Sequence, residues 1–234
     1  SPTAQTSSLR LLGRAAESRT SRGKTMRMTT IRLAGLLAAS LALLAAGQTA
    51  RAQSAFKPLF NGKDLTGWVT PDDKTLFSVE DGVIVGRTAE KQLKKNEFLV
   101  SDKPYKNFIL KVKLKLRNHN SGIQVRSKRA PDGAVSGPQA DAADKYWGLL
   151  YEERGRGMVD TTGIEKAAPV VKKDDWNDYV ITFKGKHLTI VFNGVTVIDR
   201  EDEKFADEGI IAFQVHAGPA MEGRFKDIAI EELP

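Results

Sequence analysis

Three pairs of polar residues, each spaced two positions apart in an otherwise apolar run, are the residues of this chain best suited to chemistry. The pairs are Gln124 with Arg126, Gln139 with Asp141, and Gln214 with His216. Side chains two positions apart point to the same side of a β-strand, so each pair should present two polar groups on one face. If the three strands are neighbours, these side chains line one surface.

These residue types suit acid–base chemistry on a polar substrate. His216 titrates near neutral pH and can carry a proton. Asp141 can act as a base if it is desolvated, or can orient His216, and Arg126 can stabilise a developing oxyanion. A hydrogen-bonded scaffold or a solvated face explains any single pair more simply, but three pairs in one domain favour a functional surface. His119, in a turn beside this face, is ambiguous, and His187 is expected at the surface.

The sequence lacks the patterns of several common active sites. It has no cysteine, no nucleophile elbow, no metalloprotease helix motif, no P-loop and no dinucleotide-binding glycine pattern. Its three histidines are far apart, and no calcium-binding loop is present, so we predict no metal and no cofactor. It also has no strand with alternating carboxylates of the kind that a glycosidase on a β-sandwich would use.

The positive charge of the chain does not point to nucleic acid. The formal net charge is +7, but residues 1–52 hold eight Lys and Arg and one acidic residue. Residues 53–234 therefore hold 28 basic and 28 acidic side chains and are formally neutral. A basic surface for phosphate groups is not expected where the fold is.

The N-terminal region resembles an export signal. Two arginines, Arg27 and Arg32, precede an apolar run of about 14 residues at 33–46, and Ala50-Arg51-Ala52 follows. The run is shorter than the roughly 20 residues that a membrane span needs. We predict an upstream leader at 1–27, either disordered or not translated, and a signal peptide at 28–52 cleaved before Gln53. The mature protein is expected in the periplasm or secreted, without stable membrane insertion.

Residues 53–234 are predicted to form a single β domain. Strict alternation at Phe108–Leu116 puts leucine and valine on one side and lysine on the other, which only a strand can do. Asp81-Gly82 and Asn193-Gly194 mark hairpin turns. Many short strands with glycine-containing turns favour an all-β jelly-roll sandwich, although the pattern does not separate it from other sandwiches. We expect a long irregular loop at Lys128–Val171, whose aromatic residues form a wall for a sugar-sized pocket.

Several segments, in the same order, resemble the DUF1080 or 3-keto-disaccharide hydrolase family. The resemblance covers nearly all of 56–234, with one departure at Pro138, where an aromatic residue is common in the family. It rests on the segments at 60–68, 120–126, 135–141, 146–153, 175–177, 193–194 and 214–228.

The resemblance implies a concanavalin A-like jelly roll and action on glycosides whose sugar carries a 3-ketone. Such a ketone acidifies the hydrogen on C2, so a base can remove it, the glycosidic oxygen can leave, and water can add. Our hypothesis assigns either Asp141 or His216 as the base and the other as the acid, without deciding between them, with Arg126 and Gln139 polarising the ketone or enolate. The expected substrate-binding residues are Gln124, Trp147, Tyr151, Glu152, Gln214 and Asn120.

Two other classes stay open from sequence. A lectin-like carbohydrate-binding module of the cell envelope would use the same face with Trp147 and Tyr151 stacked on the sugar. A purely structural envelope domain would neither bind nor turn over sugar. An ordinary endo-glucanase is disfavoured by the missing carboxylate strand. The glycoside, its linkage, the identity of the base, the presence of a metal ion in the pocket and the oligomeric state do not follow from the sequence.

Overall fold

The computed structural model describes residues 55–88 and 92–234, which belong to one compact unit. The predicted leader and signal peptide, at 1–27 and 28–52, lie outside the described residues. Within the described ranges, no helix is both long and apolar enough to cross a membrane.

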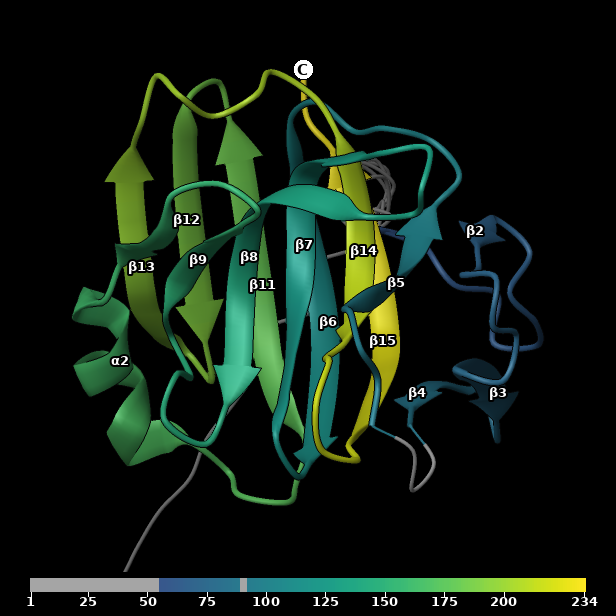
Figure 1. Cartoon of the computed structure of the whole chain (residues 1–234). Helices are drawn as coiled ribbons and strands as arrows, with labels where there is room; N and C mark the ends of the chain where they lie inside the picture. Colours follow the sequence, from purple (N-terminus) through teal and green to yellow (C-terminus); the bar gives the residue numbers. More distant parts are fainter. Residues whose placement is uncertain (1–54, 89–91) are drawn as a thin grey trace, which may run out of the picture. The chain divides into compact units, whose positions relative to one another are not determined.

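The described residues form two antiparallel sheets, which we call sheet A and sheet B (Figure 1). Sheet A has the strand order β13-β12-β11-β6-β15-β4-β3, with β1 beside β15. Its strands are β1 (Lys57–Pro58), β3 (Phe77–Glu80), β4 (Val83–Arg87), β6 (Phe108–Arg117), β11 (Asn177–Lys184), β12 (His187–Phe192), β13 (Val195–Glu201) and β15 (Glu222–Glu232).

Sheet B has the order β10-β9-β8-β7-β14-β5-β2. Its strands are β2 (Trp68–Val69), β5 (Glu97–Ser101), β7 (Asn120–Arg129), β8 (Val135–Ala143), β9 (Leu150–Glu153), β10 (Gly157–Asp160) and β14 (Ile210–Val215). Two sheets that pack face to face, each pairing strands distant in sequence, make the all-β jelly-roll sandwich predicted from the sequence.

The core between the sheets comes from the inward side of alternating strands. Leu110, Val112 and Leu114 of β6 are buried, as the alternating pattern predicts. Phe213 of sheet B stacks on Phe225 of sheet A with ring centroids 4.3 Å apart, which joins the two sheets. The predicted hairpin turns are present; in one of them Asn193 has a φ of 46°, the left-handed backbone that such turns require.

The middle of the chain differs from the expectation of a long irregular loop. Between Lys128 and Val171 the structure has strands β8, β9 and β10, the six-residue helix α2 (Thr162–Ala167) and the 3₁₀ turn Ala168–Val170. Strand β8 reads VSGPQADAA, with small residues on both sides, so it carries no hydrophobic alternation that a sequence pattern could detect.

Strand β7 contains one extra residue relative to both of its neighbours. Gln124 pairs with Gln139 of β8 and Ala212 of β14, but by Lys128 the register with β8 has shifted by one residue, and the register with β14 shifts as well. Arg126 sits in this bulge with a φ of 45°. Because a one-residue slip exchanges the two faces, Arg126 points opposite to the side that alternation from Gln124 predicts.

The prediction that Gln124 and Arg126 share a face is therefore wrong. The guanidinium of Arg126 lies 4.2 Å from the ring centroid of Phe183 in the core. It donates to the carbonyls of Lys106 (2.5 Å), Gly185 (2.6 Å) and Ala206 (3.0 Å), and to Oδ1 of Asn107 (3.0 Å). Arg126 thus ties three loops together at one end of the sandwich.

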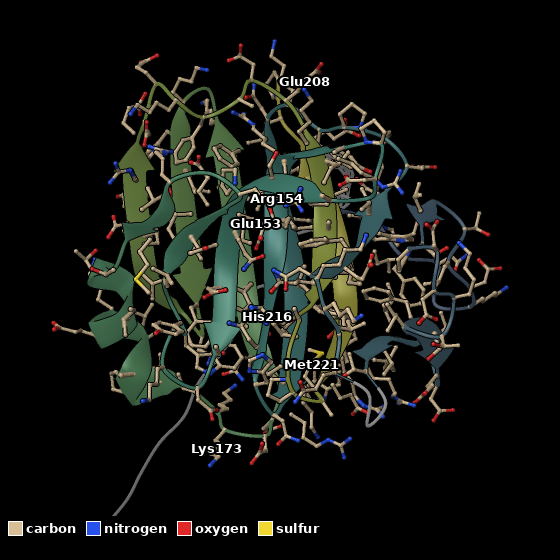
Figure 2. The ribbon with its side chains drawn as sticks, viewed as in Figure 1. Glu153, Arg154, Lys173, Glu208, His216 and Met221 are labelled. Carbon is tan, nitrogen blue, oxygen red and sulfur yellow. The ribbon has the colours of Figure 1, made fainter. Side chains whose placement is uncertain are left out.

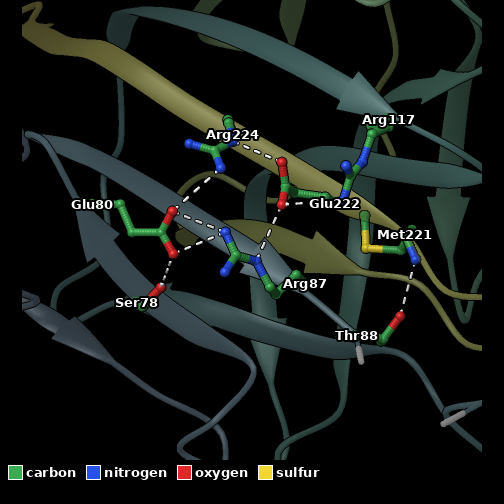
Figure 3. A network of polar contacts seen from close by, with 8 residues as sticks. All are labelled: Ser78, Glu80, Arg87, Thr88, Arg117, Met221, Glu222 and Arg224. Atoms are coloured by element: carbon green, nitrogen blue, oxygen red, sulfur yellow. Dashed lines mark hydrogen bonds and ion pairs between the residues drawn. The ribbon is translucent and has the colours of Figure 1, made fainter. Parts of the chain in front are cut away.

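A network of charged side chains ties β3, β4, β6 and β15 together (Figure 3). Glu222 of β15 lies 2.7 Å from Arg224 and 3.1 Å from Arg87. Arg87 and Arg224 both contact Glu80 of β3, at 2.8 and 3.2 Å. These contacts stabilise the sheet A edge that lies away from the polar surface described below.

Replacement of Arg126 by methionine should lower the free energy of unfolding by about 2 kcal/mol or more. The variant loses four charge-assisted hydrogen bonds, and the desolvation cost of a buried cation that is removed offsets only part of that loss. Chemical denaturation measures the effect. The control is R129M, at an exposed arginine of the same strand; equal destabilisation in the two variants would contradict this structural role.

Candidate functional site

A cavity of about 190 Å³ opens on the face of sheet B that points away from the core. Five residues expected at the site line it: Asn120, Gln139, Asp141, Tyr151 and His216. They come from β7, β8, β9 and the end of β14, which the sheet order places beside one another. Of the six paired side chains predicted to line one surface, Gln139, Asp141 and His216 therefore meet at this cavity, and Gln124, Arg126 and Gln214 do not line it.

A chain of hydrogen bonds runs along the outer face of β7 and β8. The hydroxyl of Ser127 donates to Oε1 of Gln124 (2.6 Å), and Nε2 of Gln124 donates to Oε1 of Gln139 (2.8 Å). Nε2 of Gln139 in turn donates to Oδ1 of Asp141 (2.7 Å). Each buried amide thus has its orientation fixed by the next, so the Asp141 carboxyl is held in one position.

A close approach of backbone and side chain makes room for this chain. A Cβ added to Gly122 of β7 would lie 2.6 Å from Cγ of Gln139, closer than real Cβ atoms come. Gly122 pairs with Asp141 across the two strands. The glycine therefore allows the Gln139 side chain to lie flat over β7 and reach Asp141.

Burial gives Asp141 an unusual protonation equilibrium. Only 5% of the residue is exposed, and this desolvation raises the pKa of Asp141 to about 7. The hydrogen bond from Gln139 opposes the rise, and the nearby Glu153 carboxylate adds to it. Near neutral pH, Asp141 exists in both its acid and its base form.

His216 is shifted in the opposite direction. Burial lowers its pKa below the usual 6.5, helped by His119 and opposed by the Ala217 carbonyl and Glu153. Nδ1 of His216 lies 2.6 Å from the carbonyl oxygen of Ala217. We assign the Nδ1 proton to this bond, so neutral His216 keeps the lone pair of Nε2 for a proton from the cavity.

His119, whose role was ambiguous from the sequence, contacts His216. Nε2 of His119 is 3.0 Å from Nδ1 of His216, and the rings meet edge to face. Asn118 and His119 form the two-residue turn between β6 and β7, both with a φ of 62°. A non-glycine pair in this left-handed conformation is strained, and here it places an imidazole against the site.

Glu153 is the main residue that sequence reasoning missed. It lines the cavity, and its carboxylate accepts hydrogen bonds from Asn96 (3.3 Å) and Gln214 (3.1 Å). Glu153 lies two positions after Tyr151, so in a strand both side chains share one face, but this segment was expected to be irregular. The other lining residues not predicted are Asn96, Leu149 and Met158, whereas Tyr146 is one of the aromatic residues expected in the wall.

Two buried acceptors at the site lack a hydrogen bond within the described residues. They are Oδ1 of Asn120, which lines the cavity, and Oε1 of Gln214. A buried carbonyl oxygen without a donor is costly. Hydroxyl groups of a bound sugar would supply donors to such atoms.

Four residues expected to bind substrate do not line the cavity. Gln124 and Gln214 are fully buried and donate hydrogen bonds to the lining residues Gln139 and Glu153, and the other two lie elsewhere. Trp147 is buried in the core, where its ring lies 5.4 Å from that of Phe192 and 6.4 Å from that of Tyr179. Packing against apolar rings takes it away from the cavity that Tyr151 lines. Glu152 faces the other side of β9 from its neighbours and pairs with Arg156 at 2.6 Å, so it does not line this cavity.

Within the part of the chain that the structure describes, no group of three or more metal-binding side chains comes together. Figure 2 shows Glu153, Arg154 and His216 on the same side of sheet B, with His216 towards one end of the face and Arg154 towards the other. The arrangement offers a carboxyl, an imidazole and a second carboxylate around one cavity, which suits proton transfer.

One family of known proteins matches most of the chain. Its model, described as 3-keto-alpha-glucoside-1,2-lyase-like domain, matches residues 55–231. No curated protein sequence matches the chain.

Solved structures show the same fold. A protein of Parabacteroides distasonis ATCC 8503 named "putative glycosyl hydrolase" is 25% identical, covers 76% of this chain and 94% of its own, and has a TM-score of 0.59. The β-glucanase of Bacillus licheniformis is 12% identical with a TM-score of 0.54, over 76% of this chain and 97% of its own. The carbohydrate-binding module CBM66 of Bacillus subtilis is 16% identical with a TM-score of 0.52, over 71% and 96%.

Because the pKa of Asp141 is raised in the folded state, the free energy of unfolding should depend on pH. The folded state holds the proton of Asp141 up to about pH 7, whereas the usual pKa of this side chain, which applies to the unfolded chain, is 3.8. The stability contributed by this proton is present below pH 3.8 and is lost as the pH rises through 7.

The amide of D141N cannot ionise. We therefore expect the free energy of unfolding of D141N, measured relative to that of the unmodified protein, to increase by about 3 kcal/mol between pH 4.5 and pH 7.5. Urea unfolding at the two pH values measures this. The control is D72N, at an exposed aspartate. The same pH dependence in both variants would mean that Asp141 is not desolvated.

Proposed function

We propose that this chain, which belongs to the 3-keto-alpha-glucoside-1,2-lyase-like family, cleaves glycosides whose sugar carries a ketone at C3. The coarser conclusion is that its family is one of proteins that act on glycosides. The finer proposal concerns the bond broken and the residues that move protons. It is supported by the two oppositely shifted titrating groups around one cavity.

The reaction is an elimination. A base takes the proton from C2, and the electron pair moves toward the C3 ketone to form an enolate. When the enolate collapses, a C1–C2 double bond forms, the C1–O bond breaks, and the departing oxygen takes a proton from an acid. Water that adds across the new double bond completes a net hydrolysis. No pair of glycosidase carboxylates is required.

His216 is the base and Asp141 is the acid in this proposal. A base must be unprotonated and an acid protonated at the working pH. The lowered pKa of His216 favours the neutral imidazole, and the pKa of Asp141 at about 7 keeps part of its population protonated. That both groups line one cavity is the observation that carries the assignment.

Other residues of the cavity orient the sugar. Tyr151 and the Asn120 amide offer a hydroxyl and an unpaired acceptor. The second N–H of the Gln139 amide is a donor that can polarise the ketone. Arg126 has no part in this step, because its guanidinium contacts main-chain oxygens at the end of the sandwich. Gln214 holds Glu153 in place.

We also propose that the protein is exported to the periplasm or secreted. The basis is the apolar run at 33–46 with its preceding arginines and the Ala-Arg-Ala segment before Gln53. Determining the N-terminal residue of protein recovered outside the cytoplasm tests it, and Gln53 is the expected result.

Turnover of matched substrates tests the reaction. The protein should release the alcohol from a 3-keto-glucoside but not from the parent glucoside, which has no acidified C2 hydrogen. Deuterium in place of the hydrogen on C2 should slow release of the alcohol, because the C2–H bond breaks in the reaction.

Cleavage of the unoxidised parent would instead indicate ordinary glycosidase chemistry. Binding without cleavage of either compound would place the protein among carbohydrate-binding modules. Unchanged turnover in both D141A and H216A would refute the residue assignment.

The dependence of kcat/KM on pH tests whether two such groups take part. It should rise as His216 loses its proton, below pH 6.5, and fall as Asp141 loses its proton near pH 7, which gives a narrow maximum. D141N should lower the rate roughly 100-fold or more and remove the alkaline limb. A rate that keeps rising through pH 8 would contradict the role of Asp141 as the acid.

A further inference from the structure

Apolar side chains gather on one side of the cavity, which we call the apolar wall. The wall comes from the loop after β8 and from β9 and β10, and its residues are Tyr146, Leu149, Tyr151 and Met158. Tyr151 pairs with Gln139 of β8 on one side and with Met158 of β10 on the other, so the three side chains share a face of sheet B. The proposed proton transfers use none of the four wall residues.

Two residues of the apolar wall are exposed. Among the described residues, three large apolar side chains are exposed, namely Val69, Tyr146 and Met158, and Met158 is the most exposed at 53%. A single exposed apolar residue is common and needs no explanation. Here, however, two of the three line the same cavity, which indicates a surface that is covered by a ligand.

The other side of the cavity is polar. Asn96, Asn120 and His216 line it, from the segment before β5, the start of β7 and the residue after β14. Glu153 of β9 also serves this side, because its carboxylate accepts hydrogen bonds from Asn96 and Gln214. The apolar wall, in contrast, offers only two phenol hydroxyls as hydrogen-bonding groups. One side of the cavity therefore suits the hydroxyls of a sugar, and the other suits an apolar group.

The proposed acid lies next to the apolar wall. The backbone N–H of Asp141 donates to the carbonyl of Leu149 at 3.1 Å. The proposed base, His216, contacts His119 on the polar side. In the elimination the base acts on C2 of the sugar and the acid meets the oxygen on C1. The sugar ring therefore lies towards His216, and the departing group lies towards the apolar wall.

We propose that the apolar wall binds the leaving group and that this group is aromatic, so that the preferred substrate is an aryl 3-keto-glycoside rather than a disaccharide. The C1–O bond breaks, its oxygen takes the proton of Asp141, and the product departs as a phenol. Its ring packs against tyrosine rings and the Met158 thioether. The hydroxyls of a second sugar would lose water against Leu149 and Met158 without gaining partners. The proposal rests on the proposed function for the order of the two halves.

Two substrates that differ in the polarity of the leaving group test the proposal. They are the 3-keto-glucosides of 4-ethylphenol and of 4-(hydroxymethyl)phenol, two phenols of similar size and acidity, so the chemical step is matched. We expect kcat/KM to favour the ethyl compound roughly fivefold, because a methyl group gains from burial where a hydroxyl loses water.

The double variant Y146Q/M158Q should bring that ratio close to one. M158Q alone changes only the most exposed residue of the wall and should roughly halve the ratio, so the test does not depend on the double variant. The control V69T changes the remaining exposed apolar residue, which does not line the cavity, and should keep the ratio.

A ratio near one in the unmodified protein, with both compounds cleaved, would overturn the apolar subsite and leave the proposed function intact. A preference that persists in Y146Q/M158Q would also overturn it, because the preference would then arise elsewhere.

A binding measurement separates the subsite from the reaction. Calorimetric titration with 4-ethylphenyl glucoside, methyl glucoside and cellobiose requires no ketone and no turnover. Tighter binding of the aryl glucoside, lost in Y146Q/M158Q and kept in V69T, would support the subsite even if no 3-keto-glycoside is cleaved. Cellobiose binding as tightly as the aryl glucoside would overturn it, because a second sugar would then fit equally well.

Discussion

The single extra residue in β7 determines which of its side chains lie on the polar face and which one turns into the core. Before the bulge, Gln124 is in register with Gln139 and holds the chain of hydrogen bonds that ends at Asp141. At the bulge, Arg126 turns into the core and binds three loops. Beyond it, the register with β8 is shifted by one residue. One backbone irregularity thus separates the hydrogen-bonded polar face from the buried cation that binds the loops.

Desolvation is the main electrostatic effect at the cavity. It raises the pKa of the Asp141 carboxyl to about 7 and lowers that of the His216 imidazole below its usual 6.5, which reverses their usual order. Amide groups rather than opposite charges surround Asp141, so its acid form is not suppressed by an ion pair. This environment suits a substrate whose reactive hydrogen is already acidified by its own ketone, since the protein need only hold and exchange protons.

The sequence predicted the class of fold because alternation in β6 and the Asp-Gly and Asn-Gly turns follow local rules. It also predicted that Gln139, Asp141 and His216 share a surface, because spacing by two survives in a regular strand. Arg126 does not follow the spacing rule, because its bulge arises from the pairing of β7 with other strands and leaves no local pattern in the sequence. Trp147 and Glu153 were misjudged or missed because small residues in β8 concealed the sheet that orients them.

The position of β14 between β7 and β5 has a consequence for folding. The hairpin that presents His119 forms from residues close in sequence, but His216, which contacts it, lies 97 positions further along the chain. Closing such a distance is slow, and it follows the formation of local turns. A chain still being synthesised therefore lacks His216. The pair of imidazoles is complete only when β14, one of the last strands, has been added to sheet B.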